Sequence, residues 1–294
     1  MKKNRSLYIF RLFSTVTWAP VMKFAFSTNA FRRHSILEAI AAIARAGYTG
    51  VEIMADTPHA FPRDIGIADI EAIRGALAGN SIESSNINAF MMCAAGDFWH
   101  PSWVEKNEER RRLRIEHTAG CIRLASALGA RTVSTEPGGP LDGIAQGQAL
   151  EFFERGLREV IPLAARNGIR ILIEPEPGLL IENTAEAEAF LKRIDSPHVG
   201  LNFDIGHFFC VGEKPADAFR RLARFVGHVH LEDIGEDRRH YHLVPGAGAI
   251  DFEAFFRAVR DAEYDGWMTV ELYTCEEAPE RAAGEALAFL GKFA

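Results

Sequence analysis

Short apolar runs alternate with longer amphipathic segments from Lys23 to the end of the chain. Runs of four to six apolar residues bounded by Gly, Asn or Pro are typical of buried parallel strands, and the intervening segments are long enough for one helix each. Eight such units favour an α/β protein with a single (β/α)8 TIM barrel over an open doubly wound sheet. No Gly-x-Gly-x-x-Gly motif follows the first strand, which weakens a dinucleotide-binding alternative.

The boundaries of these units follow from local signals. Ser35-Ile-Leu-Glu38 has the form of a capping box and opens the first helix, and Asn167-Gly168 closes a later one. The expected strands are 23–27, 51–54, a segment within 82–90, 131–135, 169–174, 199–204, 226–230 and 267–271. The main expected helices are 108–128, 152–165, 185–194, 215–225, a helix capped by Asp251, and 282–290.

The first 21 residues differ from the rest of the chain. Lys2, Lys3 and Arg5 precede a short apolar stretch, but Arg11 interrupts what would be the apolar core of a secretory signal. Because a strand-like segment begins directly after Met22, we predict that Met22 is the functional start. Residues 1–21 are then a disordered or spurious extension, and 22–294 form the barrel domain.

Four apolar runs in the second half of the chain each end on a residue that can bind a divalent cation: Glu174, Asp204, His230 and Glu271. In a closed barrel the carboxyl ends of all strands open onto one mouth, so these side chains are expected to converge. Three carboxylates and one imidazole suit Mn2+ or Mg2+, with Co2+ or Zn2+ as alternatives. The competing interpretation makes each residue a helix cap or surface group, but burying several carboxylates without a cation is costly.

Further polar residues follow the same strands. His207 begins the loop beyond strand six and can point at a substrate hydroxyl, or it is a loop histidine bonded to backbone. Glu176 is flanked by two prolines that stiffen its loop, which would hold its carboxylate in place as a substrate ligand. His240 and His242 can join a second metal site or bind substrate; two solvated loop histidines are an equal alternative.

Other candidates come from aromatic and basic positions. Arg238 and Arg239 are the expected anion contacts, against the alternative of a solvated charge run. Trp99, His100 and Trp103 follow strand three and are candidates for a pocket wall, with core packing as the alternative. His228 lies two residues before His230 on the same strand face and is interpreted as a buried supporting histidine.

Composition restricts the class of partner. The formal net charge of -7 argues against a nucleic-acid backbone or an anionic membrane and favours a small neutral or polar substrate. The four cysteines are far apart and form no Cys-x-x-Cys pair, which suits free thiols and a cytoplasmic location. No apolar run approaches the roughly 20 residues that span a bilayer.

The motifs at 200–207, 228–233, 245–252 and 270–271 resemble those of the xylose isomerase-like barrels, from Met22 to the C-terminus. That superfamily includes sugar isomerases, ketose 3-epimerases, inosose dehydratases and, more distantly, endonuclease IV. The resemblance implies that the four strand-end residues are the ligands of one metal, that His207 binds substrate, and that Glu174 and Glu271 form an acid/base pair. It also implies a homo-oligomer, either a dimer or a tetramer.

This chain departs from the ketose epimerases after strand seven, so the resemblance identifies no substrate arginine. The sequence is interpreted as a metal-dependent isomerase or epimerase of a sugar, sugar phosphate or keto sugar, acting through a stabilised ene-diolate. A dehydratase of the inosose type shares the first half of this mechanism and is the main alternative. A sugar-binding protein without turnover and an endonuclease IV-like enzyme are the others.

Overall fold

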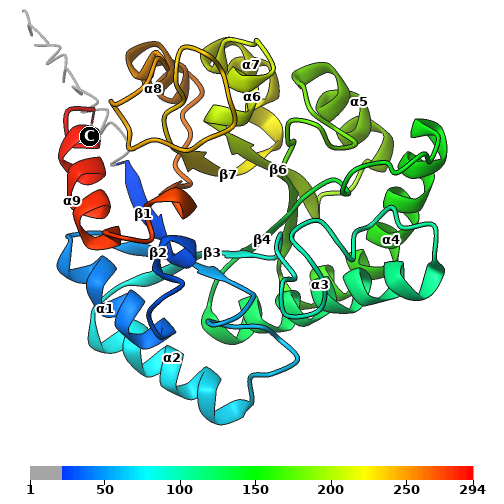
Figure 1. The fold of residues 1–294 in the computed structure, drawn as a ribbon, viewed down its shortest axis with the longest axis horizontal. Coiled ribbons are helices and arrows are strands. Elements are labelled where there is room, and N and C mark those ends of the chain that lie inside the picture. The colour runs from blue at the N-terminus through cyan, green and yellow to red at the C-terminus, as the bar shows by residue number, and fades with distance from the viewer. Residues whose placement is uncertain (1–21, 294) are drawn as a thin grey trace, which may run out of the picture.

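The computed structural model describes residues 22–293, so the extension expected at 1–21 lies outside the described residues. Eight parallel strands pair in sequence order and close into a barrel, and helices surround it (Figure 1). The strands are β1 Lys23–Ser27, β2 Gly50–Met54, β3 Glu83–Asn88, β4 Thr132–Thr135, β5 Arg170–Ile173, β6 Val199–Asp204, β7 Val226–Leu231 and β8 Trp267–Val270.

The helices of the outer layer follow the strands in turn. They are α1 Ile36–Arg45, α2 Ile67–Gly79, α3 Glu108–Leu128, α4 Gln146–Asn167, α5 Thr184–Ile194, α6 Ile205–Cys210, α7 Pro215–Leu222, α8 Phe252–Asp261 and α9 Pro279–Leu290, with short 3-10 turns η1 Thr28–Phe31, η2 Ala223–Phe225 and η3 Tyr273–Cys275. The single (β/α)8 barrel expected from the sequence is therefore present.

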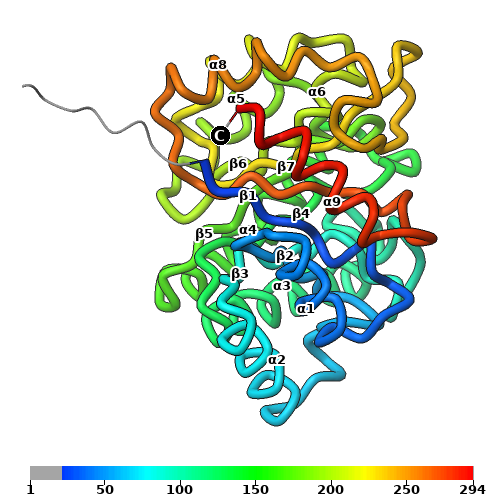
Figure 2. Tube along the Cα trace, turned by 90° about the vertical axis from the view of Figure 1, so that its left-hand side faces the viewer, coloured from blue at the N-terminus to red at the C-terminus, as the bar shows by residue number. Residues whose placement is uncertain are grey.

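The barrel closes where β1 pairs with β8, with Phe24 opposite Met268. Helix α9 then lies beside β1 and packs against α1, so the two ends of the described chain are close in space (Figure 2). The Tyr48 hydroxyl after α1 donates to the Ala283 carbonyl of α9 at 3.0 Å. These contacts hold α9 over the outer face of the sheet where the barrel closes. A parallel sheet needs such cover on its outer face.

The largest differences from the sequence expectation concern two helices. Helix α4 begins at Gln146, six residues before the predicted start, because Ala149 and Phe153 both pack into the core. The short α6 was not expected; it begins where Asp204 caps the backbone N–H of His207. Within residues 22–293, no helix combines the length and apolarity that a membrane crossing requires.

Candidate active site

The four polar residues at the ends of the last strands come together at one mouth of the barrel. Glu174 directly follows β5, Asp204 ends β6, His230 lies near the end of β7, and Glu271 directly follows β8. Ligand atoms of all four lie within 4.8 Å of one another, and all four side chains are buried. His230 is central: its Nδ1 is 2.8 Å from Glu174 Oε1, 3.7 Å from Asp204 Oδ2 and 3.6 Å from Glu271 Oε2.

Local structure fixes each carboxylate in this cluster. Asp204 uses Oδ1 to accept the backbone N–H of His207 at 2.7 Å, as an N-cap, which leaves Oδ2 directed at the cluster. Glu271 uses Oε1 to accept the side-chain amides of Asn29 at 2.9 Å and Asn88 at 3.1 Å. Its Oε2 therefore stays free to face His230.

This donor set fits a divalent cation. Asp204 Oδ2 is buried and has no hydrogen-bond partner. The four side chains bring three carboxylates to one imidazole in a water-poor site, and isolated buried charges of this kind are costly. Oxygen-rich sites with one imidazole suit a hard or borderline divalent ion. A single divalent cation between these atoms would offset most of the negative charge of the three carboxylates and bind the free Asp204 oxygen.

Burial and neighbouring charges shift the pKa values of the cluster. Burial opposes protonation of His230, but the carboxylates of Glu174 and Glu52 outweigh it and hold the pKa of His230 well above its usual value. Burial raises the pKa of Glu271 far above the usual range; the charge of His230 opposes this rise and that of Glu174 adds to it. Both pKa values rise, because the neighbouring carboxylates favour the protonated form of each group.

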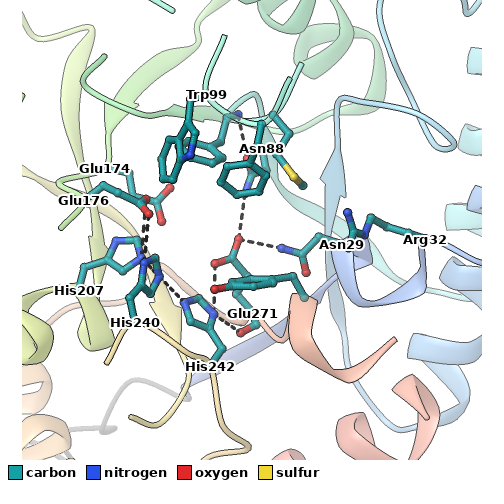
Figure 3. A pocket seen from close by; sticks show the side chains of 14 residues that line it. Asn29, Arg32, Asn88, Trp99, Glu174, Glu176, His207, His240, His242 and Glu271 are labelled. Carbon is teal, nitrogen blue, oxygen red and sulfur yellow. Dashed lines mark hydrogen bonds and ion pairs between the residues drawn. The ribbon is translucent and has the colours of Figure 1, made fainter. Parts of the chain in front are cut away.

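A cavity of about 240 Å³ opens above the cluster. Figure 3 shows Glu174 and Glu176 on one side of it, with Asn29 and Arg32 on the other and Glu271 between. Its lining residues come from the ends of six of the strands or from the segments that follow them: Asn29, Arg32, Asn88, Phe90, Met91, Phe98, Trp99, Glu174, Glu176, His207, His240, His242, Glu271 and Tyr273. Trp99 contacts Phe90 and Phe98 edge-on, which forms an apolar wall.

Three histidines form another part of the cavity wall. His207 Nε2 lies 3.0 Å from His240 Nε2, which lies 3.1 Å from His242 Nε2. His207 Nδ1 faces the Pro175 carbonyl and His242 Nδ1 faces the Glu271 carbonyl, both at 2.9 Å, so each Nδ1 carries a proton while the Nε2 atoms face one another. These nitrogens also lie within the range of a metal site.

The surroundings of the three histidine rings give them different pKa values. Burial lowers the pKa of His207, but the charges of Asp204 and Glu176 raise it overall to about 9. Burial lowers the pKa of His240 to about 3 and that of His242 to about 4. His207 is thus the cationic member of the group, and the other two are neutral.

The loop that carries His240 and His242 is organised by Asp233. Its carboxylate accepts the backbone N–H groups of Ile234, Gly246, Gly248 and Ile250, at distances of 2.8 to 3.1 Å. Asp233 also pairs through its backbone with Leu243. A buried carboxylate with four donors is strongly fixed, so the two histidines are held over the barrel mouth.

Glu176 lies in the cavity wall opposite Arg32. Its Oε2 is 3.7 Å from His207 Nε2 and its Oε1 is 3.4 Å from His240 Nδ1. Burial raises the pKa of Glu176 to about 8, while the charge of His207 acts in the opposite direction. The stiff loop expected from the two flanking prolines thus places this carboxylate among the histidines.

The structure does not bring every predicted residue to the cavity. Arg238 lies outside it, because its guanidinium packs 4.1 Å from the centre of the Phe209 ring and donates to the Phe209 carbonyl. His100 turns away, with Nδ1 2.9 Å from Glu105 Oε1 and Nε2 3.3 Å from Asp142 Oδ2. Neither residue is among those that line the cavity, and both contact these local partners instead.

Trp103 belongs to the core rather than to the cavity wall. Its side chain is buried, its Nε1–H donates to Thr135 Oγ1 at 2.9 Å, and its ring packs against Phe153. His228 is fully buried as expected, between Asn202 Oδ1 and Thr269 Oγ1 at 2.8 Å each. Of the aromatic residues proposed for the wall, Trp99 is the one that lines the cavity.

The sequence alone did not identify several residues of the site. Asn29 and Asn88 bind Glu271, Glu52 of β2 binds His230, and Arg32 lines the cavity while paired with Glu276. Asn88 ends a strand of mostly polar residues, so an apolar run could not reveal it. Glu52 lies within a predicted strand. The sequence signal that could have revealed it is a carboxylate between apolar neighbours.

Comparison with known proteins places the fold in a family. A family model described as the xylose isomerase-like TIM barrel matches residues 40–293. The chain belongs to the xylose isomerase-like TIM barrel family. An inosose dehydratase from Clostridium perfringens is 25% identical to this chain, and the match covers 82% of this chain and 83% of that relative.

Solved structures share the barrel fold. The 3-keto-D-glucoside 4-epimerase YcjR from E. coli superposes with a TM-score of 0.76 at 22% identity, covering 92% of this chain and 100% of that one. An IolI protein with a bound zinc atom superposes with a TM-score of 0.76 at 19% identity, covering 93% and 99%. At these identities the two structures show the barrel fold.

Proposed function

We propose that this protein is a metal-dependent isomerase or epimerase of a ketose or related polyol derivative. Glu174, Asp204, His230 and Glu271 would be the ligands of one divalent cation. The observation that carries the proposal is their convergence within 4.8 Å at the base of a cavity. A sugar-sized substrate in that cavity would lie between the buried carboxylates and the Trp99 wall.

A bound divalent cation would polarise the substrate carbonyl and stabilise the negative charge left when the neighbouring C–H proton is removed. Glu174 and Glu271 reach the cavity from β5 and β8, which lie three strands apart in the ring. One carboxylate takes the C–H proton and the other returns a proton, which inverts the carbon or moves the carbonyl. Asn29 and Asn88 donate hydrogen bonds to Glu271 Oε1, which leaves its Oε2 for the proton transfer.

The charge of the cavity favours a substrate without a phosphate group. Glu174, Glu176 and Glu271 line it, whereas Arg32 is the one lysine or arginine among its described lining residues. Arg32 is already paired with Glu276. The described lining therefore offers a phosphate no lysine or arginine that is not already paired, while hydroxyls can bond to carboxylates, amides and imidazoles alike.

The oxygen-rich donor set favours Mn2+ or Mg2+. Zn2+ and Co2+ belong in the same test, because the IolI structure with a similar fold holds a zinc atom. Each metal would be added to metal-free protein before activity is measured. We expect Mn2+ or Mg2+ to support the highest rate.

A dehydratase is the second candidate function, and the named relatives favour it. Inosose dehydratases from Clostridium perfringens and other bacteria are among the relatives of this chain. Proton removal next to a carbonyl is common to both reactions. In the dehydratase, the electron pair of the broken C–H bond then forms a C=C bond as a β-hydroxyl leaves as water.

One experiment separates these functions. Metal-loaded protein is incubated in D2O with a panel of ketoses, inososes and 3-keto sugars, each with a phosphorylated counterpart where one exists. Deuterium uptake at carbon without loss of water identifies an isomerase or epimerase, and elimination identifies a dehydratase. If neither is seen with any substrate, both proposals fail.

A further inference from the structure

Glu52 is a fully buried carboxylate in the middle of β2 that does not line the cavity. Its Oε2 lies 2.7 Å from His230 Nε2 and accepts the Asn86 side-chain amide at 2.8 Å. A substrate in the cavity cannot reach it. Any effect of Glu52 on the site must therefore pass through the residues it touches.

The two edges of the His230 ring face different partners. Nδ1 faces the carboxylates of Glu174, Asp204 and Glu271, and Nε2 faces Glu52. A neutral imidazole carries one ring proton, and a metal ligand must offer a lone pair from the other nitrogen. With the proton on Nε2 donated to Glu52, the Nδ1 lone pair is directed at the three carboxylates.

Further hydrogen bonds hold the Glu52 carboxylate itself. The Asn86 amide that donates to Glu52 also donates to Ser134 Oγ at 2.8 Å, which fixes it between two strands. Asn88 Nδ2 lies 3.1 Å from Glu271 Oε1 and 3.5 Å from Glu52 Oε1. Glu52 thus belongs to a polar layer beneath two of the four clustered side chains.

We propose that Glu52 is a positioning residue that selects the ring tautomer of His230 and fixes its orientation, so that Nδ1 binds the cation. This inference rests on the proposed metal site. A carboxylate that accepts the second N–H of a ligating histidine raises the basicity of that ligand and prevents ring rotation, and losing such a partner weakens metal affinity by about 10- to 100-fold.

The test compares cation affinity in wild type, Glu52→Ala and Glu52→Gln, by calorimetric titration of metal-free protein with Mn2+. We expect Glu52→Ala to weaken binding by about 10- to 100-fold. We expect a smaller loss of Mn2+ affinity in Glu52→Gln, whose amide oxygen can still accept a hydrogen bond from His230 Nε2–H. Nitrogen-15 NMR of the Zn2+-loaded wild type should show His230 protonated at Nε2.

Asp56→Asn is the matched control. Asp56 is a buried carboxylate just beyond β2 that accepts the backbone N–H groups of Thr57, Cys93 and Ala94 and touches none of the four clustered side chains. We expect this variant to lose stability while its Mn2+ affinity stays within about twofold of wild type.

The outcomes distinguish two failures. Equal Mn2+ affinity in wild type and folded Glu52→Ala would overturn the role of Glu52 alone, as would an equal loss in Asp56→Asn. Absence of Mn2+, Zn2+ and Co2+ binding by the wild type would instead refute the metal site on which the inference depends.

Discussion

Glu174 bonds to His230 and also lines the cavity, so its two proposed roles can be tested by one change of charge. Glu174→Gln keeps the shape of the side chain but removes a formal charge and a proton acceptor. We expect turnover to fall by about 100-fold or more, the size of a general acid–base contribution, with the circular dichroism spectrum retained. The exposed Glu151→Gln on α4 serves as the control. Turnover near the wild-type rate in metal-saturated Glu174→Gln would exclude Glu174 from both roles.

His207 and His230 are predicted to differ in what they bind. His207→Ala should leave metal content nearly unchanged and weaken substrate binding or turnover, because a hydrogen bond contributes about 0.5 to 1.5 kcal/mol between neutral groups and more when one group is charged. His230→Ala should lower metal occupancy directly, since its Nδ1 faces three carboxylates. Metal analysis and steady-state kinetics on both variants check this; equal metal loss would place His207 among the ligands.

At the scale of elements, the loop between β3 and α3 depends on one buried arginine. Arg114 of α3 donates to the carbonyls of Ala89, Phe90 and Pro101, at 2.7 to 3.0 Å, and lies 3.3 Å from Glu136 Oε1. This loop carries the aromatic residues of the cavity wall. The helix therefore positions the wall through a side chain rather than through packing alone.

Replacing Arg114 should destabilise the protein. Arg114→Leu leaves three buried carbonyls and one buried carboxylate without their cationic partner, and breaking a buried pair in this way costs about 3 to 5 kcal/mol. Urea unfolding measures the change, with the exposed Arg123→Leu on the same helix as the control. A loss no larger than that of Arg123→Leu would show that these hydrogen bonds contribute little.

Strand β3 shows what hydrophobic pattern cannot reveal at this scale. Its sequence is mostly polar, yet every residue after the exposed Glu83 is buried. Asn86 bonds to Ser134 and Ser85 lies 3.2 Å from Thr269, so polar groups from separate strands satisfy one another. Buried polar residues are stable when they are hydrogen-bonded, and the partners lie far apart in sequence.

At the scale of the whole molecule, removing the cation should lower thermal stability. A ligand that binds only the folded state stabilises it by about 2.7 kcal/mol at 100 times its dissociation constant. We expect a chelator to lower the Tm and added Mn2+ to restore it. In His230→Ala the response to Mn2+ should be much smaller. A Tm in wild type that is independent of chelator and of Mn2+ would contradict the proposed cation.

The sequence by itself determined the barrel and the main elements of its site. The apolar runs that end on Glu174, Asp204, His230 and Glu271 predict a common site, because every parallel strand in a closed ring ends at the same mouth. The tertiary structure alone decided which loop residues face the cavity. Arg238 and His100 turn to local partners, whereas Asn29, Asn88 and Glu52 meet the cluster from other strands. Such contacts depend on side-chain direction and on pairing across the barrel, which no periodicity along one chain records.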